Sequence, residues 1–321
     1  MELRELGRSG LKVSPVCLGG NVFGWTADEK ASFAVLDDFT TAGGNFIDTA
    51  NVYSTWVEGH QGGESETVLG KWLKSRGNRE KIIVATKVGA EMGDGRKGLK
   101  AGYIAEMVED SLRRLQIDTI DLYQSHRDDE TTPQEETLEA YAKLIKAGKV
   151  RAIGASNFTA ARLSEALAIS ARNGWPRYES LQPEYNLCDR GGYEQDLEPL
   201  CRKEQIGVIG YFGLARGFLS GKYRSKADLG KSQRGEDIEA EYFNDRGFRI
   251  LAAVDAVAAE AKATPAQVAV AWLIARPGVT APIVSATKVE QSHDLVKAMR
   301  LKLSPAQIEA LNQASAQEAT A

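Results

Sequence analysis

The stretch KIIVATKVG (residues 81–89), an amphipathic segment over 103–115 and the run TIDLYQSH (residues 119–126) together decide the fold. Both short runs are apolar and rich in β-branched residues before they reach their polar ends, as expected of strands covered on both faces. The segment between them has helical spacing. Because parallel strands need a crossover connection, this strand–helix–strand unit predicts an α/β fold.

The same alternation recurs along the chain. We expect strands at 16–19, 46–48, 82–86, 119–124, 150–154, 180–182, 207–210 and 282–284, and helices at 28–42, 64–74, 103–115, 134–147 and 159–172. Strand–helix units of this number close naturally into a (β/α)8 TIM barrel, with a doubly wound open sheet as the alternative. The turn signal Arg8-Ser9-Gly10 predicts an N-terminal β-hairpin over 3–13. Proline after an N-cap residue marks helix starts at Thr264-Pro265 and at Ser304-Pro305, the latter an extra C-terminal helix.

Residues 1–321 are expected to form a single barrel domain. Two segments stand outside the repeat. Residues 223–246 are polar, rich in Lys, Asp and Glu, and lack clean periodicity, which predicts an irregular lid over a ligand. The small polar tail 312–321 is expected to fray.

Composition excludes several classes of protein. A net charge of −4 gives no reason to expect nucleic acid or a membrane as partner. We expect no signal peptide and no membrane span, because no run approaches the ~18 apolar residues that a span needs. The three cysteines and three histidines lack metal-binding spacing, which predicts a metal-free, cytoplasmic protein. A monomer or weak homo-oligomer is expected.

Polar residues follow the predicted strands at the points where each strand ends, which is where barrel active sites lie. Asp48 and Tyr53 follow the second strand, Lys87 the third and His126 the fourth. A Lys ammonium beside a phenol favours the phenolate, so Lys87, held charged by Asp48, is expected to lower the pKa of Tyr53. His126 could orient a carbonyl group by a hydrogen bond. These residues predict reduction of a carbonyl with Tyr53 as the proton donor.

Structural interpretations compete with this one, since Asp48 could simply cap the following helix. Trp25, Trp56 and Phe23 lie on loops after the first two strands and could line an apolar substrate pocket.

The segment 93–98 (GDGRKG) matches GxGxxG, but it follows the third strand. We interpret it as a loop that shapes the substrate pocket rather than as a dinucleotide site.

Seven motifs carry a resemblance to a known family. They are FIDTANVYS (46–54), GGESETVLG (62–70), ATKVG (85–89), DLYQSH (121–126), IGASNF (153–158), QPEYN (182–186) and ARGFLSGKY (215–223). Their order and spacing resemble the aldo-keto reductase superfamily, in its bacterial type, over nearly the whole chain. The resemblance implies an NADP-dependent oxidoreductase that acts on small aldehydes or ketones, with Asp48, Tyr53, Lys87 and His126 as its catalytic tetrad.

The resemblance also implies where NADP(H) binds. The implied contacts are Ser156, Asn157 and Gln182 for the carboxamide, Leu214, Gly217 and Lys222 for the pyrophosphate, and Asn21, Asp48, Tyr211, Thr287, Lys288 and Gln291 elsewhere. Tyr211 would stack on the nicotinamide ring. Lys288, at the start of the helix after the eighth strand, suits a 2′-phosphate and favours NADP over NAD. Phe212-Gly213 replaces the family's usual Ser-Pro, so one hydroxyl contact is missing.

Two other functions stay open from the residues alone. One is a regulatory subunit that senses the nicotinamide cofactor on the same fold. The other is a hydrolase or lyase that uses Asp48 and Glu64 as paired carboxylates. Loop composition does not name the physiological substrate, the strictness of NADP preference or the direction of the reaction.

Overall fold

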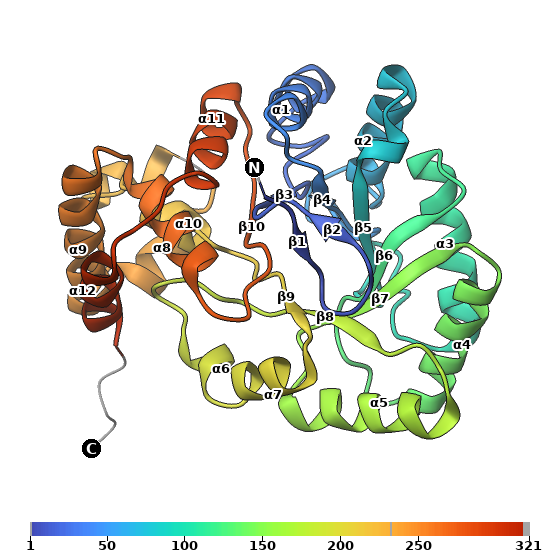
Figure 1. Cartoon of the computed structure of the whole chain (residues 1–321). Helices are drawn as coiled ribbons and strands as arrows, with labels where there is room; N and C mark the ends of the chain where they lie inside the picture. The colour runs from blue at the N-terminus through green and yellow to red at the C-terminus, as the bar shows by residue number, and fades with distance from the viewer. Residues whose placement is uncertain (1, 232, 317–321) are drawn as a thin grey trace.

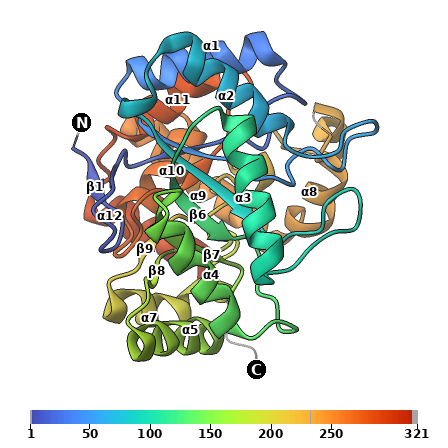
Figure 2. The same cartoon turned by 90° about the vertical axis from the view of Figure 1, so that its right-hand side faces the viewer.

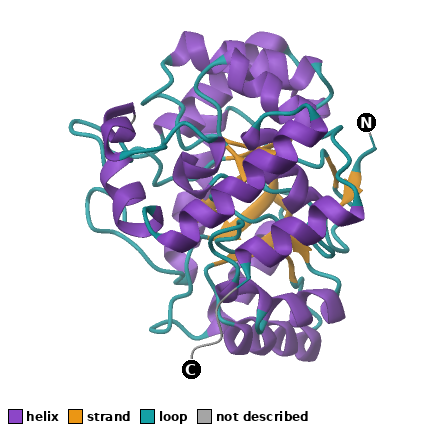
Figure 3. Ribbon diagram, turned by 90° about the vertical axis from the view of Figure 1, so that its left-hand side faces the viewer, coloured by secondary structure: helices purple, strands orange, loops and turns teal. Residues whose placement is uncertain are grey.

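The computed structural model describes residues 2–231 and 233–316. Its centre is an eight-stranded parallel sheet in the order β10-β3-β4-β5-β6-β7-β8-β9, ringed by helices (Figure 1, Figure 3). The strands are β3 (Cys17–Gly19), β4 (Phe46–Asp48), β5 (Ile83–Val88), β6 (Ile120–Ser125), β7 (Val150–Ser156), β8 (Tyr178–Gln182), β9 (Gly207–Val208) and β10 (Ile283–Val284). These are the strands that the sequence predicts, with shifts of a few residues at their ends.

Hydrogen bonds between the last two strand segments close the sheet into a barrel. The amide of Thr280 donates to the carbonyl of Val208 at 2.8 Å, and the amide of Ile283 donates to the carbonyl of Gly210 at 2.8 Å. Because β10 also pairs with β3, these bonds join β9 and β10, the two ends of the strand order. The predicted (β/α)8 barrel is therefore confirmed over the open sheet.

The helices cover the outside of the barrel (Figure 2). They are α1 (Glu29–Thr41), α2 (Glu64–Arg76), α3 (Ala101–Leu115), α4 (Gln134–Lys146), α5 (Ala160–Asn173), α6 (Gly191–Glu194), α7 (Leu197–Glu204), α8 (Gly235–Tyr242), α9 (Asp245–Ala261), α10 (Pro265–Ala275), α11 (Val289–Ala298) and α12 (Pro305–Ser315), with 3-10 turns η1 (Arg79–Lys81), η2 (Ala215–Ser220) and η3 (Lys226–Lys231). Thr264 and Ser304 are the N-caps of α10 and α12, as the sequence predicts, and each also forms a complete capping box. Within the described ranges, no helix has both the length and the apolar character to cross a membrane.

The predicted N-terminal hairpin is present and seals one end of the barrel. Its strands β1 (Arg4–Glu5) and β2 (Lys12–Val13) pair antiparallel. Leu6, Leu11 and Val13 are buried against residues that begin their strands, such as Cys17 and Phe46. This end is therefore filled with apolar side chains, and the polar strand ends lie at the opposite mouth.

Two predictions about segments outside the repeat need correction. Residues 223–246 are not irregular, because they contain η3 and α8, and α9 begins at Asp245; residue 232 lies outside the described residues. The predicted fraying from residue 312 is wrong for 312–315, which form the last turn of α12. The indole of Trp272 donates to Asn312 at 2.9 Å, and Arg190 donates to the hydroxyl of Ser315 at 2.8 Å, so both residues are anchored. Residues 317–321 lie outside the described part of the chain.

Candidate active site

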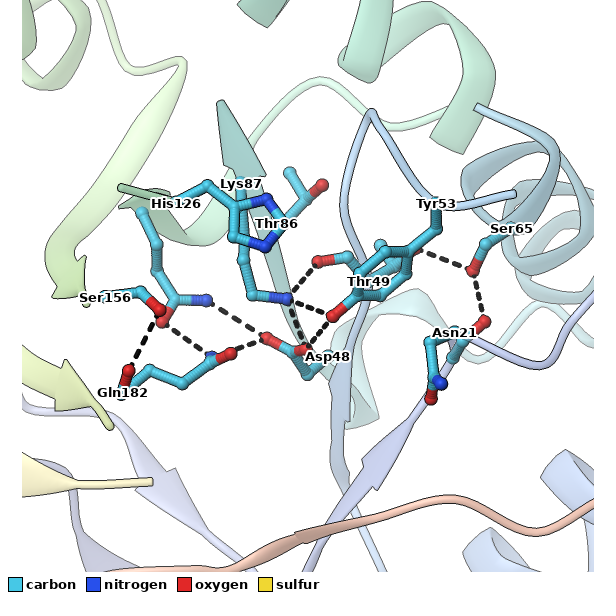
Figure 4. A network of polar contacts seen from close by, with 12 residues as sticks. Asn21, Asp48, Thr49, Tyr53, Ser65, Thr86, Lys87, His126, Ser156 and Gln182 are labelled. Carbon is cyan, nitrogen blue, oxygen red and sulfur yellow. Dashed lines mark hydrogen bonds and ion pairs between the residues drawn. The ribbon is translucent and has the colours of Figure 1, made fainter. Parts of the chain in front are cut away.

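Asp48, Tyr53 and Lys87 meet at the mouth of the barrel (Figure 4). The ammonium of Lys87 donates to Asp48 Oδ2 at 2.5 Å, to the phenol oxygen of Tyr53 at 2.6 Å and to the carbonyl of Thr49 at 2.9 Å. The phenol in turn donates to Asp48 Oδ2 at 3.2 Å. Strand register explains the meeting, because Asp48 pairs with Ala85 and Lys87 lies two residues further on the same face. The sequence predicts this cluster, and the structure brings it together.

The carboxylate of Asp48 is fully buried and has donors on both oxygens. Its Oδ1 accepts from the side-chain amides of Gln124 at 3.1 Å and Gln182 at 3.0 Å, while Oδ2 takes the two bonds described above. A buried carboxylate needs such donors, because burial removes its hydration. The alternative that Asp48 caps the following helix is wrong, since the N-cap of α2 is Gly63.

The pKa of Tyr53 moves opposite to the expected direction. Burial raises this pKa well above its ordinary value, and the carboxylate of Asp48 raises it further. Burial lowers the pKa of Lys87, against the influence of Asp48. Because the ammonium is already neutralised by a carboxylate at 2.5 Å, a phenolate here would face the anion as well as the cation. The phenol therefore stays protonated at neutral pH, which is the state that a proton donor needs.

His126 lies beside Tyr53, with ring centroids 6.0 Å apart at 79°. Its backbone amide donates to the carbonyl of Val88 at 2.8 Å, which fixes the start of the β6–α4 loop. Burial lowers the pKa of His126 well below its ordinary value, and Lys87 and Arg127 add to the effect. The imidazole is therefore neutral at neutral pH. Its Nδ1 is buried without a hydrogen-bond partner among the described residues.

A second layer of polar contacts supports the centre and was not predicted from the sequence. Glu66, fully buried on α2, accepts from the Thr86 hydroxyl at 2.5 Å and from Arg114 Nε at 2.7 Å. The hydroxyls of Ser65 and Thr49 bond at 2.7 Å. The first turn of α2 thus braces the ends of β4 and β5. One feature of the sequence could have indicated these contacts. Thr49 and Thr86 lie at strand ends, and buried hydroxyl groups require hydrogen-bond partners.

The predicted carboxamide and ring contacts gather on one side of the mouth. Asn157, at φ +58°, donates to the hydroxyl of Ser156 at 3.1 Å and to the carbonyl of His126 at 3.0 Å. Its side-chain oxygen accepts from the phenol of Tyr211 at 2.9 Å. The Ser156 hydroxyl donates to the backbone carbonyl of Gln182 at 2.9 Å. These bonds fix the positions of all four residues relative to the centre.

The predicted pyrophosphate contacts lie on η2 and just beyond it. Gly217 has φ +107°, and a Cβ added there would lie 3.7 Å from Lys222 Nζ. The positive φ favours glycine at this position, and the ammonium of Lys222 lies close to its backbone. Leu214 is the N-cap of η2. Arg216, which was not predicted, pairs with Glu241 of α8 at 2.9 Å and ties this segment to that helix.

The remaining predicted cofactor contacts lie around the start of α11. Lys288 is its N-cap and makes no side-chain capping bond. Gln291 accepts from the amide of Thr287 at 2.8 Å and from its hydroxyl at 3.1 Å. The hydroxyl of Ser285 donates to Asn21 at 2.5 Å, which links the loop after β3 to the same place. A helix N-terminus with a lysine beside it is a favourable site for a phosphate.

Two of the three predicted pocket residues lie near Tyr53. The rings of Trp25 and Trp56 contact edge to face at 5.5 Å, and Trp56 lies 6.1 Å from the ring of Tyr53. Trp56 is 51% exposed and presents an apolar surface there. The prediction for Phe23 is wrong, because its side chain is fully buried in the core and packs near Gly20.

The glycine-rich segment 93–98 does not form a phosphate cradle. The amide of Gly95 donates to the carbonyl of Met92 at 2.8 Å, and the amide of Gly98 donates to the carbonyl of Gly89 at 3.0 Å. These amides serve the loop's own turns and are not available to a phosphate. Among the described residues, no group of His, Cys, Asp and Glu could hold a metal ion.

Comparisons with known proteins agree with this geometry. The model of the aldo/keto reductase family matches residues 15–316. The chain is 37% identical over 320 residues to "uncharacterized oxidoreductase YrpG" of Bacillus subtilis, covering 97% of this chain and 95% of that protein. It is 33% identical to a "probable voltage-gated potassium channel subunit beta" of rice, with 93% and 91% covered. It is 31% identical to "norsolorinic acid reductase" of Aspergillus flavus, with 95% and 79% covered.

Proposed function

Because this chain belongs to the aldo/keto reductase family, we propose that it reduces small aldehydes or ketones to alcohols with NADPH. The observation that supports this most is the contact of Lys87 with both Asp48 and Tyr53. Through this contact, the protonated phenol of Tyr53 lies against the ammonium of Lys87, which also forms a buried ion pair with Asp48. Relatives named as an oxidoreductase and as a reductase agree with the reaction class.

Tyr53 is the proton donor in this proposal. Its raised pKa keeps the proton on the phenol until a substrate oxygen gains negative charge. As the proton leaves, the ammonium of Lys87, which donates to the phenol oxygen at 2.6 Å, stabilises the phenolate that forms. Asp48 holds the ammonium in place at 2.5 Å. A proton donor of this kind typically contributes ~10² to 10⁴ in rate.

His126 positions the carbonyl. A neutral imidazole carries one N–H and can donate it to the substrate oxygen without adding a charge to the site. Its ring lies next to that of Tyr53, so two donors can reach one oxygen. Trp25 and Trp56 would contact the apolar part of a substrate.

The residues on the other side of the mouth fit a nicotinamide dinucleotide. Lys222 lies close to the backbone of Gly217, whose positive φ favours glycine, and Lys288 is the N-cap of α11. Lys222 would hold the pyrophosphate and Lys288 a 2′-phosphate, while Asn157 keeps the ring of Tyr211 in place for the nicotinamide. The bound cofactor supplies the hydride that the side chains of the protein cannot provide.

Replacing Tyr53 with Phe tests the proposal. The variant is expected to lose ~10²-fold or more of the aldehyde-dependent NADPH oxidation, while its affinity for NADPH stays near normal. Tyr193→Phe is a matched control, because the phenol of Tyr193 is buried without a hydrogen-bond partner among the described residues. Equal turnover by wild type and Tyr53→Phe would refute the assignment.

The same assay separates the regulatory alternative. The relative named as a potassium channel subunit beta is compatible with a cofactor sensor but does not favour one. A sensor would bind NADPH and turn over slowly on every aldehyde in a panel. A reductase oxidises NADPH rapidly with at least one of them.

A further inference from the structure

The first turn of α2 holds the end of β4 through Ser65. The hydroxyl of Ser65 is fully buried and donates to the carbonyl of Gly20 at 2.7 Å. It forms a second hydrogen bond of 2.7 Å with the hydroxyl of Thr49 (Figure 4). Thr49 directly follows Asp48, and its own carbonyl accepts from the ammonium of Lys87 at 2.9 Å. Ser65 is therefore linked to this ammonium through a single residue.

The next residue of α2, Glu66, holds the end of β5. Thr86 directly precedes Lys87 on this strand, and side chains alternate along a strand, so the hydroxyl points out of the barrel while the ammonium points in. That hydroxyl donates to Glu66 Oε1 at 2.5 Å. The two strands that carry the ion pair of Asp48 and Lys87 are thus attached to consecutive side chains of one helix.

Glu66 is held from a second side as well. Its carboxylate is fully buried, and Oε2 accepts from Nε of Arg114 on α3 at 2.7 Å. Close packing of the helices adds to this bond, since a Cβ added to Gly70 of α2 would lie 2.2 Å from the carbonyl oxygen of Arg114. The two helices therefore approach each other closely at a glycine, which makes the first turn of α2 a fixed support for both strand ends.

The ion pair that these bonds support has little tolerance in distance. The ammonium of Lys87 lies 2.5 Å from Asp48 Oδ2 and 2.6 Å from the phenol oxygen of Tyr53. Both distances are at the short end of the range for charge-assisted hydrogen bonds, so a shift of about 1 Å would break them. Misplacement by this amount can lower a rate ~10²-fold. Proton donation from Tyr53 therefore depends on the spacing of β4 and β5 at the mouth.

We propose that Ser65 and Glu66 are positioning residues for proton donation. Through their hydrogen bonds to the two strand ends, they set the distance between the ammonium of Lys87 and the phenol of Tyr53, and they act without contacting the substrate. The inference rests on the proposed function, in which Tyr53 is the proton donor. It gives the first turn of α2 a part in the reaction beyond stabilising the fold.

Thr86→Val tests the proposal, because it removes the hydroxyl that binds Glu66 but keeps the shape and the charges of the site. Single-turnover oxidation of bound NADPH by an aldehyde is measured, so that product release does not hide the effect. The maximal rate is expected to fall about tenfold, whereas the affinities for NADPH and aldehyde stay within about twofold. Thr86→Ser keeps a hydroxyl and should keep most of the rate. A wild-type rate in Thr86→Val overturns the proposal, as does an equal fall in Thr86→Ser.

Ser65→Ala tests the other bond and should lower the maximal rate by a similar factor. Ser170→Ala is the matched control, because the hydroxyl of Ser170 on α5 is also buried and donates to the carbonyl of Pro176 at 3.0 Å, before the start of β8. The control should melt at a lower temperature without a fall in rate. Equal falls in both variants would overturn the proposal, because a general loss of stability would then explain them, and so would a wild-type rate in Ser65→Ala.

A measurement without turnover separates this inference from the proposed function. The pKa of Lys87 is followed by the ¹³C NMR signal of its ε-carbon in lysine-labelled protein, and the signal is identified by its loss in Lys87→Met. Burial lowers this pKa, and the carboxylates of Asp48 and Glu66 oppose the decrease. The titrating groups that face the ammonium are Asp48, Tyr53, Cys17, Glu66 and His126.

Thr86→Val changes no charge, so a change in the pKa of Lys87 reports movement of the ammonium relative to these groups. We expect a lower pKa in this variant, because the ammonium moves away from Asp48 while it stays buried. If wild type reduces no aldehyde, the proposed reaction fails, yet this decrease still supports the positioning. Equal pKa values of Lys87 in wild type and Thr86→Val overturn it, whatever the activity.

Discussion

Replacing Lys87 with Met removes the ammonium from the centre of the site but keeps an unbranched side chain of similar length. The carboxylate of Asp48, fully buried, would lose its bond at 2.5 Å to a charged partner. It would keep only the neutral donors Gln124, Gln182 and Tyr53. Removing one partner of a buried ion pair typically costs about 3–5 kcal/mol, because the other charge is left uncompensated.

This cost converts into a measurable change of melting temperature. An unfolding entropy of roughly 2.1 cal/mol/K per residue gives ~0.67 kcal/mol/K for a chain of 321 residues. A loss of about 3–5 kcal/mol therefore lowers the Tm of Lys87→Met by roughly 4–8 °C. The double variant Asp48→Asn/Lys87→Met contains neither charge, so it should melt above Lys87→Met.

The assay is scanning calorimetry of wild type, both variants and the control Lys203→Met, whose lysine is 80% exposed on α7. The control should melt within about 1 °C of wild type, because surface substitutions cost little. NADPH oxidation measured on the same samples should fall by ~10²-fold or more in Lys87→Met, since the phenolate loses its ammonium. A Tm for Lys87→Met equal to that of wild type would refute the reasoning, as would a double variant less stable than the single one.

Two titrating groups give predictions about pH. One is His126, and the other is Glu184, which follows β8 by two residues and pairs with Tyr211 through a backbone bridge. The lowered pKa of His126 means that the unfolded chain binds the extra proton below about pH 6.5, so the free energy of unfolding should fall by ~1 kcal/mol between about pH 6.5 and about pH 5.5. Urea titrations measure this loss. His126→Gln should reduce it, and an undiminished loss in His126→Gln would contradict the assignment. Burial raises the pKa of Glu184 to about 7, so its unfolded form ionises first and stability is lost as the pH rises from about 4.5 to about 7. Glu184→Gln should then exceed wild type by ~1 kcal/mol at about pH 8, allowing for solvent screening, but not at about pH 4, and equal stabilities at the higher pH would count against it.

The barrel and the central residues could be predicted because the signals are local. Each strand is a short apolar run, each helix has its own period, and parallel strands bring their carboxyl ends to one mouth. Asp48, Lys87 and His126 all follow such runs directly. Their convergence then needs no knowledge of long-range contacts beyond the order of the strands.

The errors concern properties that depend on distance and burial. A lysine near a tyrosine predicts a lowered pKa only if its charge is available, and here Asp48 neutralises Lys87 at 2.5 Å. Phe23 lies in a loop, but it turns into the core. Glu66 is one polar residue on an amphipathic helix, and nothing in its spacing shows that it is fully buried beneath β5. Sequence periodicity indicates on which face of a helix or strand a residue lies, but it does not show which atoms the side chain contacts.

Asp48 shows why stability and proton donation depend on the same atoms in this barrel. Its donors come from β5, β6, β8 and the loop that holds Tyr53, so the carboxylate is fully bonded only when several strand ends have assembled. The same bonds fix the ammonium against the phenol before any substrate is present, which reduces the reorganisation needed during proton transfer. Substitutions of Gln124 or Gln182 would weaken both at once, because each leaves the buried charge with one donor fewer.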